Sequence, residues 1–348
     1  MTSLATRFTF ASAPDSWGVL DYPGPSWEQS YQKMLDEMVQ AGYSGTELGP
    51  YGFFPTDAGV LSAELSKRKL KLLGSFVPVP LSDPASAKVV VEQIRKVGGL
   101  LSSLGAPFLV LADSQSEERD RIAGRVPADG SKGLNAEQWK QVAKVVAEAA
   151  QVTGEFGLDL VFHPHVSTYV ETAAETEKFF DVTSGTKIGL CLDTGHCDYA
   201  GDDCIAEAEK YRDILRFVQI KDVDPAVLAE ARGKEMNFEQ AVEAKAFTII
   251  GEGSIDFPKF FRVLARNNYS GWMVVEQDVK FGATTRPPVE SVAASLKYLN
   301  QAVSQLDAGR SISGISVPQP WRPSCRHRDR APRPPGVHRG ASFRKSAL

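Results

Sequence analysis

The chain has 348 residues, with 39 Lys+Arg, 43 Asp+Glu, five His and four Cys. Hydrophobic residues make up 43% and charged residues 24%, as in soluble globular proteins, which excludes collagen, coiled coil and disorder for most of the chain. No segment approaches the roughly 18 uninterrupted apolar residues of a membrane helix, and the first residues lack the apolar core of a secretory signal. These features predict a cytoplasmic protein with reduced cysteines and no membrane partner.

The formal net charge of −4 is the sum of two unlike parts. Residues 309–348 hold nine basic groups, one acidic group and six prolines without periodicity, a composition typical of disorder. Residues 1–308 keep 30 basic and 42 acidic groups, a net charge of −12. We expect one folded domain over 1–308 and a disordered, solvated tail over 309–348. A nucleic-acid-binding arm is the alternative reading of the tail.

Eight short apolar runs alternate with segments of helical periodicity along the folded part. The runs lie at residues 8–11, 45–48, 72–77, 107–112, 159–163, 188–193, 217–221 and 273–276. The helical segments lie at residues 27–41, 62–68, 85–104, 136–156, 173–181, 205–212, 257–267 and 289–302. Runs that are apolar on both sides are typical of parallel strands covered on both faces. The alternation predicts an α/β fold, a single-domain (β/α)8 TIM barrel.

A doubly wound open sheet is the structural alternative to a barrel. It is disfavoured because no G-x-G-x-x-G or P-loop motif follows any of the predicted strands. Two long loops, 114–134 and 225–250, follow predicted strands. Both therefore belong to the barrel face that carries active sites, where loops of this length are usually functional.

Polar residues gather at the ends of the predicted strands. His163, His165 and His196 fall within 34 residues, near Asp193. Side chains at the carboxyl ends of neighbouring barrel strands point into one region, so a shared site is favoured over three separate core or capping histidines.

Two further strand ends extend this set. Gln219 and Lys221 lie on one face of their strand by the period of two, and Glu276 ends the last predicted strand. A buried, unpaired carboxylate is costly, and a divalent cation would remove that cost. The predicted ligands are Asp193, Gln219 and Glu276, with Glu171 or His163 as the fourth. Mixed oxygen and nitrogen donors suit Mn, Co or Mg.

Six motifs together carry a resemblance to a known family. They are Ala13-Pro14-Asp15-Ser16-Trp17-Gly18, Glu47-Leu48-Gly49-Pro50-Tyr51-Gly52, His163-Pro164-His165, Leu192-Asp193-Thr194-Gly195-His196, Gln219-Ile220-Lys221-Asp222 and Val275-Glu276-Gln277-Asp278. Over residues 8–300 the chain resembles the xylose-isomerase-like TIM barrels, and among them the inosose dehydratase-like branch of the sugar phosphate isomerase/epimerase family. The resemblance implies a metal-dependent enzyme whose small-molecule substrate is a keto-sugar or keto-cyclitol.

The resemblance also implies roles for individual residues. Asp193 and Glu276 match the family's metal ligands, whereas Gln219 stands where many relatives have His. His163 stands where ketose epimerases have Glu, so either Glu171 or His163 completes the set, with Glu171 slightly favoured. Asp222 and Asp278 are expected to support the site rather than to react.

The reaction expected from the resemblance is loss of water through an enediolate. Glu276 or Glu171 would be the base, His165 or His196 the acid, and Lys221 the stabiliser of the enolate. Lys221 is equally well interpreted as an ion-pair partner of Asp222 or Glu252. The substrate pocket would be shaped by Glu47, Trp17 and His163, with plain core packing as the alternative for Trp17.

Some alternative functions would use the same pocket for another reaction, and others would involve no catalysis. Reprotonation on the other face would make the enzyme a ketose 3-epimerase or isomerase, and a 3-dehydroshikimate dehydratase-like lyase is a related possibility. A noncatalytic sugar-binding barrel and a nucleic-acid binder acting through the tail are alternatives outside enzymology. An endonuclease with three metals is excluded, because two of the five histidines lie in the tail. Fold analogy allows a homo-oligomer.

Overall fold

The structure is a computed structural model that describes residues 7–20, 27, 29–85, 87–282 and 286–308. The predicted tail, 309–348, lies outside these residues, so its disorder and its boundary stay predictions. No described helix combines the length and the hydropathy that crossing a membrane requires.

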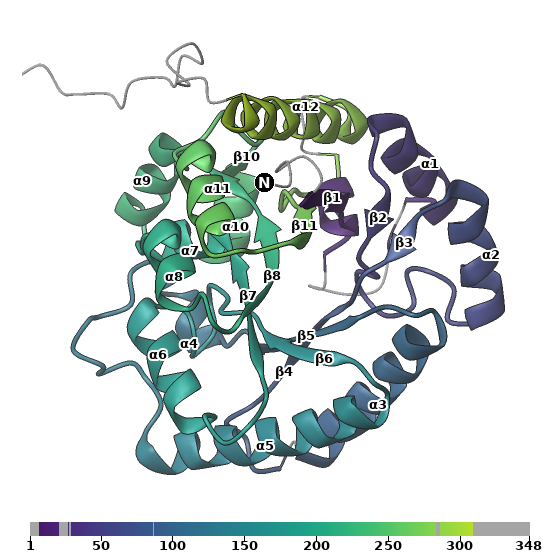
Figure 1. The fold of residues 1–348 in the computed structure, drawn as a ribbon. Helices are drawn as coiled ribbons and strands as arrows, with labels where there is room; N and C mark the ends of the chain where they lie inside the picture. The colour runs from purple at the N-terminus through teal and green to yellow at the C-terminus, as the bar shows by residue number, and fades with distance from the viewer. Residues whose placement is uncertain (1–6, 21–26, 28, 86, 283–285, 309–348) are drawn as a thin grey trace, which may run out of the picture. The chain divides into compact units, whose positions relative to one another are not determined.

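Parallel strands at the centre form one sheet in the order β3-β2-β1-β11-β8-β7-β6-β5-β4 (Figure 1). Their bounds are β1 Phe8–Ser12, β2 Gly45–Thr46, β3 Lys71–Leu72, β4 Phe76–Val79, β5 Phe108–Asp113, β6 Asp159–Phe162, β7 Gly189–Asp193, β8 Leu215–Ile220 and β11 Gly271–Val275. The sheet ends at β3 on one side and at β4 on the other, and these two strands lie at the two ends of the predicted apolar run 72–77. Leu73 N donates to Thr46 O (3.0 Å) and Leu73 O accepts from Phe108 N (3.1 Å), so the intervening residues close the ring. The predicted TIM barrel is confirmed.

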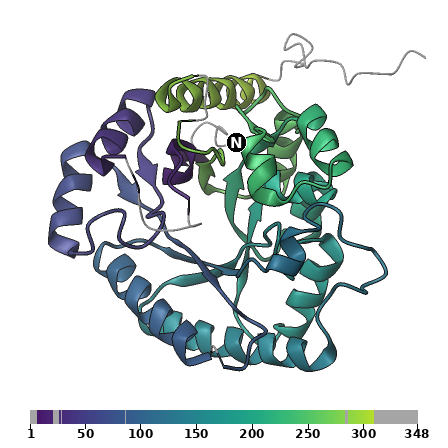
Figure 2. The same cartoon turned by 180° about the vertical axis from the view of Figure 1, so that it is seen from behind.

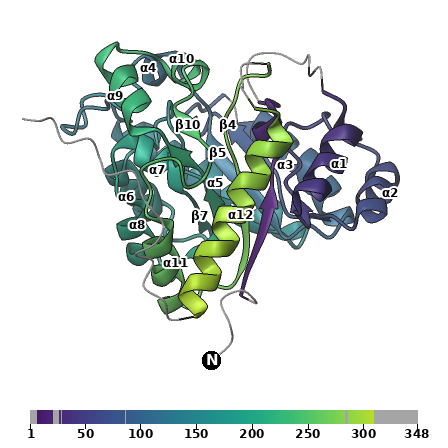
Figure 3. The same cartoon turned by 90° about the horizontal axis from the view of Figure 1, so that it is seen from above.

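Helices surround the strands, as both views of the ring show (Figures 1 and 2). The eight predicted helical segments correspond to α1 Tyr31–Ala41, α2 Ala58–Arg68, α3 Ala87–Ser103, α5 Ala136–Glu155, α6 Ala173–Val182, α8 Cys204–Lys210, α11 Phe257–Arg266 and α12 Pro288–Asp307. Capping boxes at Asn135 and Thr172 begin α5 and α6. The last helix, α12, packs against both α11 and α1 and so completes the outer ring (Figure 3).

Further short elements stand in the loops that follow the strands. They are η2 Pro14–Trp17, α4 Glu117–Asp120, α7 Thr194–Ala200, α9 Pro225–Gly233, α10 Phe238–Glu243 and the antiparallel pair β9 Asp222–Val223 and β10 Phe247–Thr248. The two predicted long loops are therefore partly helical. His196 lies just beyond the end of β7, as expected, and it stands on α7, because the Asp193 side chain accepts from His196 N (2.7 Å) and caps a helix there.

The strands bury both faces in alternation. Outward residues such as Val218 and Met273 join the large core beneath the helices, whereas Cys191, Phe217 and Val274 pack together inside the barrel. This period of two decides which side chains beyond the strand ends point inward.

Candidate active site

Strand periodicity brings the polar side chains into one place. Phe217 faces the barrel interior, so Gln219 and Lys221, two and four residues later, face the same way. The same count from Val274 turns Glu276 inward, and from Cys191 it turns Asp193 inward. The structure therefore brings these four residues together at the carboxyl end of the barrel.

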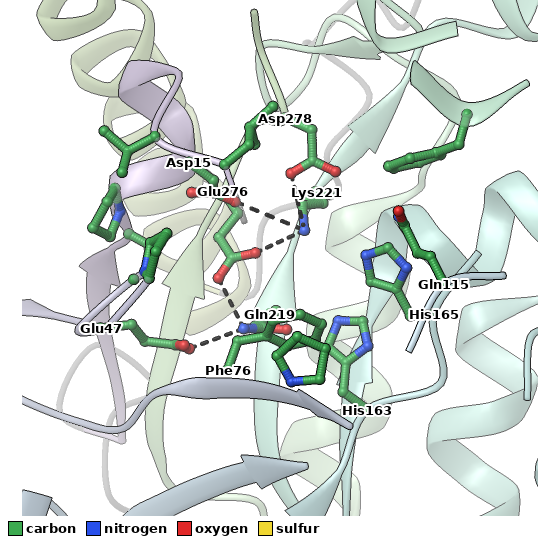
Figure 4. A pocket seen from close by; sticks show the side chains of 18 of the residues that line it. Asp15, Glu47, Phe76, Gln115, His163, His165, Gln219, Lys221, Glu276 and Asp278 are labelled. Atoms are coloured by element: carbon green, nitrogen blue, oxygen red, sulfur yellow. Dashed lines mark hydrogen bonds and ion pairs between the residues drawn. The ribbon is translucent and has the colours of Figure 1, made fainter. Parts of the chain in front are cut away.

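A cavity of about 240 Å³ opens at this end of the barrel. Figure 4 shows carboxylates on one side of it and histidines on the other. Its polar and aromatic lining includes Asp15, Glu47, Phe76, Asp113, Ser114, Gln115, His163, His165, Gln219, Lys221, Phe238, Glu276 and Asp278.

Lys221 is the cationic centre of this group. Its Nζ donates to Glu276 Oε2 (2.7 Å) and lies 3.2 Å from Asp193 Oδ2 and 3.4 Å from Asp278 Oδ1. Burial lowers the pKa of Lys221, but the carboxylates, Asp193 foremost, outweigh burial and raise that pKa above its ordinary value. Lys221 is therefore a fixed positive charge and not a nucleophile.

Gln219 links two carboxyl groups. Its Nε2 donates to Glu47 Oε1 (2.9 Å) and to Glu276 Oε1 (2.8 Å). Burial, then the nearby Glu276, raises the pKa of Glu47 to about 8, so Glu47 is mostly protonated at neutral pH. Burial also raises the pKa of Glu276, against the opposing charge of Lys221. Because the amide NH2 faces the carboxylates, Gln219 positions them in this structure.

His163, Asp193 and His196 form a compact donor group. Their ligand atoms lie within 4.8 Å of one another, and all three residues are buried. Among the described residues, His163 Nδ1 and His196 Nδ1 have no hydrogen-bond partner, which is costly for buried polar atoms, and Asp193 Oδ2 faces Lys221 Nζ (3.2 Å) and His163 Nε2 (3.7 Å). Lys221, then His163, lower the pKa of Asp193 to about 2 against the effect of burial, so the carboxylate is ionised. These residues fit a divalent cation.

His165 stacks on His196, with ring centroids 3.8 Å apart. Its Nδ1 donates to Val166 O (2.6 Å), which leaves Nε2 as the acceptor of the neutral ring. Burial, then the neighbouring His163, lowers the pKa of His165 to about 3. In the resting site His165 is therefore a neutral proton acceptor.

Four predicted site residues are not among those that line the cavity. Asp193 and His196 belong to the donor group beside Lys221, whereas Glu171 and Trp17 lie elsewhere. Glu171 accepts from Gly124 N (2.7 Å) and Ser167 N (2.9 Å), so its carboxylate holds two loops together instead of facing Asp193. The Trp17 indole is buried in the outer core and donates to Glu37 Oε2 (2.7 Å) on α1. Packing, the alternative for Trp17, describes its observed position.

The structure adds residues to the predicted catalytic, substrate-binding and metal-binding set, and one of them, Asp278, is predicted from the sequence as a supporting residue. Asp278 lines the cavity and faces Lys221, as the period of two after Glu276 would have indicated. Asp15 also lines it, and burial, then the nearby Glu276, raises the pKa of Asp15 well above its ordinary value. Phe238 comes from the loop 225–250, where the sequence carries no signal for its position.

The chain is a (β/α)8 barrel with a cavity at the carboxyl end of its strands, and carboxyl groups and imidazoles line that cavity. These two features define the class of barrel proteins to which it is compared. Residues 35–302 match the family described as xylose isomerase-like TIM barrels, and the chain belongs to that family.

Two similar proteins and one similar crystal structure indicate which members of this family the chain resembles. The inosose dehydratase of Bacillus thuringiensis (strain Al Hakam) is 32% identical over 269 residues, which cover 76% of this chain and 88% of the relative. That of Clostridium perfringens (strain 13 / Type A) is 30% identical over 295 residues, covering 83% and 95%. The crystal structure of the IolI protein with a bound zinc atom shares the fold, with a TM-score of 0.65, 14% identity and coverage of 85% and 98%. The predictions of this family and of an enzyme are confirmed.

Proposed function

We propose that the chain is a cytoplasmic, divalent-metal-dependent lyase that removes water from a keto-cyclitol, as the name of its inosose dehydratase relatives indicates. One observation carries the proposal. Buried Lys221 stands between Glu276 and the group of His163, Asp193 and His196. The cavity beside it is lined by polar side chains that can bind a polyol.

His163, Asp193 and His196 would hold the cation, which supplies Lewis acidity toward a ketone when bound. Two imidazoles and one carboxylate favour a transition metal such as Mn²⁺, Co²⁺ or Zn²⁺ over Mg²⁺. Glu276 and Gln219, two of the ligands expected from sequence, instead bond to one another here. This contact leaves Glu276 available for proton transfer.

Proton transfer falls to the residues that line the cavity. Glu276 removes the proton beside the ketone, and Lys221, 2.7 Å from Glu276, stabilises the negative charge that develops on the substrate oxygen. His165 takes up a proton from solvent at Nε2 during turnover and passes it to the leaving hydroxyl group. The leaving group then departs as water, and Glu276 returns its proton to solvent.

The test incubates the metal-loaded protein with 2-keto-myo-inositol and with ketohexoses. We expect an absorbing enedione product from the keto-cyclitol, and Glu276→Gln should abolish it. Exchange of the proton beside the ketone without loss of water would instead establish an epimerase. Equal behaviour of the wild type and Glu276→Gln in both assays would remove Glu276 from the reaction.

A further inference from the structure

The short helix η2 (Pro14–Trp17) belongs to a sequence motif that the proton transfers do not use. Pro14 packs on Gly49, where an added Cβ would lie 2.7 Å from Pro14 Cγ. Ser16 Oγ accepts from Gln277 N (3.0 Å), the residue between Glu276 and Asp278. The helix is thus fixed to two neighbouring strand ends.

The other residues of this motif, residues 13–18, also hold η2 against neighbouring elements, with one exception. Trp17 donates to Glu37 on α1, and Gly18 (φ +79°) passes so close to Phe281 that an added Cβ would lie 2.8 Å from its backbone. Asp15 is the exception, because its side chain lies among the site residues, beside Lys221 (3.8 Å) and the carboxyl groups of Glu276 and Asp278. Its side chain lines the cavity.

The Asp15 carboxylate receives no hydrogen bond from the lysine beside it. Oδ1 accepts from Ser16 N (2.7 Å), but Oδ2 lies 3.8 Å from Lys221 Nζ, beyond hydrogen-bond reach. An ammonium group has three donors. Lys221 has closer partners for all of them in Glu276, Asp193 and Asp278. Asp15 Oδ2 therefore lies beside Lys221 at the cavity without a hydrogen bond from it.

The charges around the cavity limit what Asp15 can bind. Five carboxyl residues line it, namely Asp15, Glu47, Asp113, Glu276 and Asp278, and among the described lining residues Lys221 is the one Lys or Arg. Asp15 and Asp278 lie together near Lys221, across the cavity from His163 (Figure 4). An anionic group would be repelled there, whereas a hydroxyl group can donate to a carboxylate.

We propose that Asp15 is a specificity residue that accepts a hydrogen bond from a substrate hydroxyl group outside the reacting carbons. The inference rests on the proposed function, because it takes the ligand to be a neutral cyclic polyol. The fixed position of η2 means that little side-chain freedom remains to be lost on binding.

A binding measurement tests the inference without turnover. Calorimetry of the full chain with myo-inositol, which lacks the reacting ketone, should show affinity reduced about 10- to 100-fold by Asp15→Ala and less by Asp15→Asn. The matched control Asp36→Asn removes a carboxylate on α1 that is bonded to Arg68 outside the cavity, and it should bind as the wild type does. Unchanged affinity in Asp15→Ala would overturn the inference.

Monodeoxy analogues of the same polyol identify the hydroxyl group. One analogue should bind the wild type weakly yet lose nothing further in Asp15→Ala, because the variant no longer makes that contact. An identical ranking of analogues by both proteins would contradict the inference. Absence of water loss from any keto-cyclitol, with Asp15-dependent polyol binding intact, would contradict only the proposed function.

Discussion

At the scale of single residues, the charge of Lys221 compensates three buried carboxylates. Lys221→Met removes that charge and the group that stabilises the enolate, so kcat should fall about 100- to 1000-fold in the dehydration assay. Lys88→Met, which alters an exposed lysine on α3, is the matched control. A Lys221→Met enzyme that keeps a tenth or more of its kcat would show that the catalytic charge lies elsewhere.

Asp222 gives a prediction about pH and stability. Its carboxyl group accepts from the backbone NH of Val223, Gly251, Gly253 and Ile255, yet burial raises its pKa from 3.8 to about 6. A raised pKa means that the folded state binds the proton more tightly than the unfolded state does. The stability this group contributes is therefore fully present below pH 3.8 and is lost as the pH rises through about 6.

The comparison protein for this prediction is Asp222→Asn, which has no titrating group at the position. Between pH 4 and pH 6.5 the wild type should lose about 2 kcal/mol of unfolding free energy relative to the variant. Urea unfolding across this range measures the difference. A difference that is constant, or that grows in favour of the wild type, would mean that the four NH donors keep Asp222 ionised.

At the scale of elements, Asp120 joins three loops over the site. Asp120 Oδ1 accepts from Ser167 Oγ (3.0 Å) and from Phe238 N (3.0 Å) at the start of α10. Asp120→Ala removes the acceptor of both hydrogen bonds, at a cost of about 1–3 kcal/mol. Hydrogen exchange of α10 should become faster and KM should rise, since Phe238 packs on His165 and lines the cavity.

The control for Asp120 is Asp129→Ala in the same loop. Asp129 is exposed and accepts from Ser131 within its own turn. Equal exchange rates in the two variants would show that α10 is held by its apolar contacts alone.

The elements also show what a sequence can and cannot predict. The eight barrel strands and the eight outer helices follow from periods of two and 3.6, which persist over a whole element. The helices α4, α7 and α10 are too short for a period, and each begins at one capping side chain: Ser116, Asp193 or Asn237. A cap alone is a weak signal, so the sequence places His196 just beyond a strand but does not predict the helix α7 on which it lies.

Site residues that follow a periodic strand can likewise be predicted, whereas those that follow an irregular turn cannot. Gln219, Lys221 and Glu276 were placed together correctly because they follow strands whose periodicity is clear. Glu171 follows a turn through Ser167, which adopts φ +70°, and this turn directs its carboxylate toward Gly124. Backbone reversals of this kind have no period, and a residue nine positions beyond a strand cannot be placed by counting.

At the scale of the whole molecule, charge separates the chain into two parts. Residues 1–308 carry −12 and residues 309–348 carry +8. Among the described residues, those that line the cavity lie between Ala13 and Asp278. Removing residues 309–348 should therefore leave metal content, kcat and KM within about twofold of the full chain, because all of these lining residues remain.

The truncated chain should differ from the full chain in its long-range electrostatics. With +8 removed, it should bind anion exchangers more strongly, and any weak, salt-sensitive binding to DNA should disappear. Binding to DNA that survives the truncation would place the basic contact on the barrel. Loss of activity with the tail would mean that residues beyond Ala308 complete the site, and the predicted boundary at 308 would then be wrong. Binding of a polyol requires neither contact between the tail and the cavity nor binding to DNA. The polyol is neutral, and the described cavity lining already contains a basic side chain, Lys221.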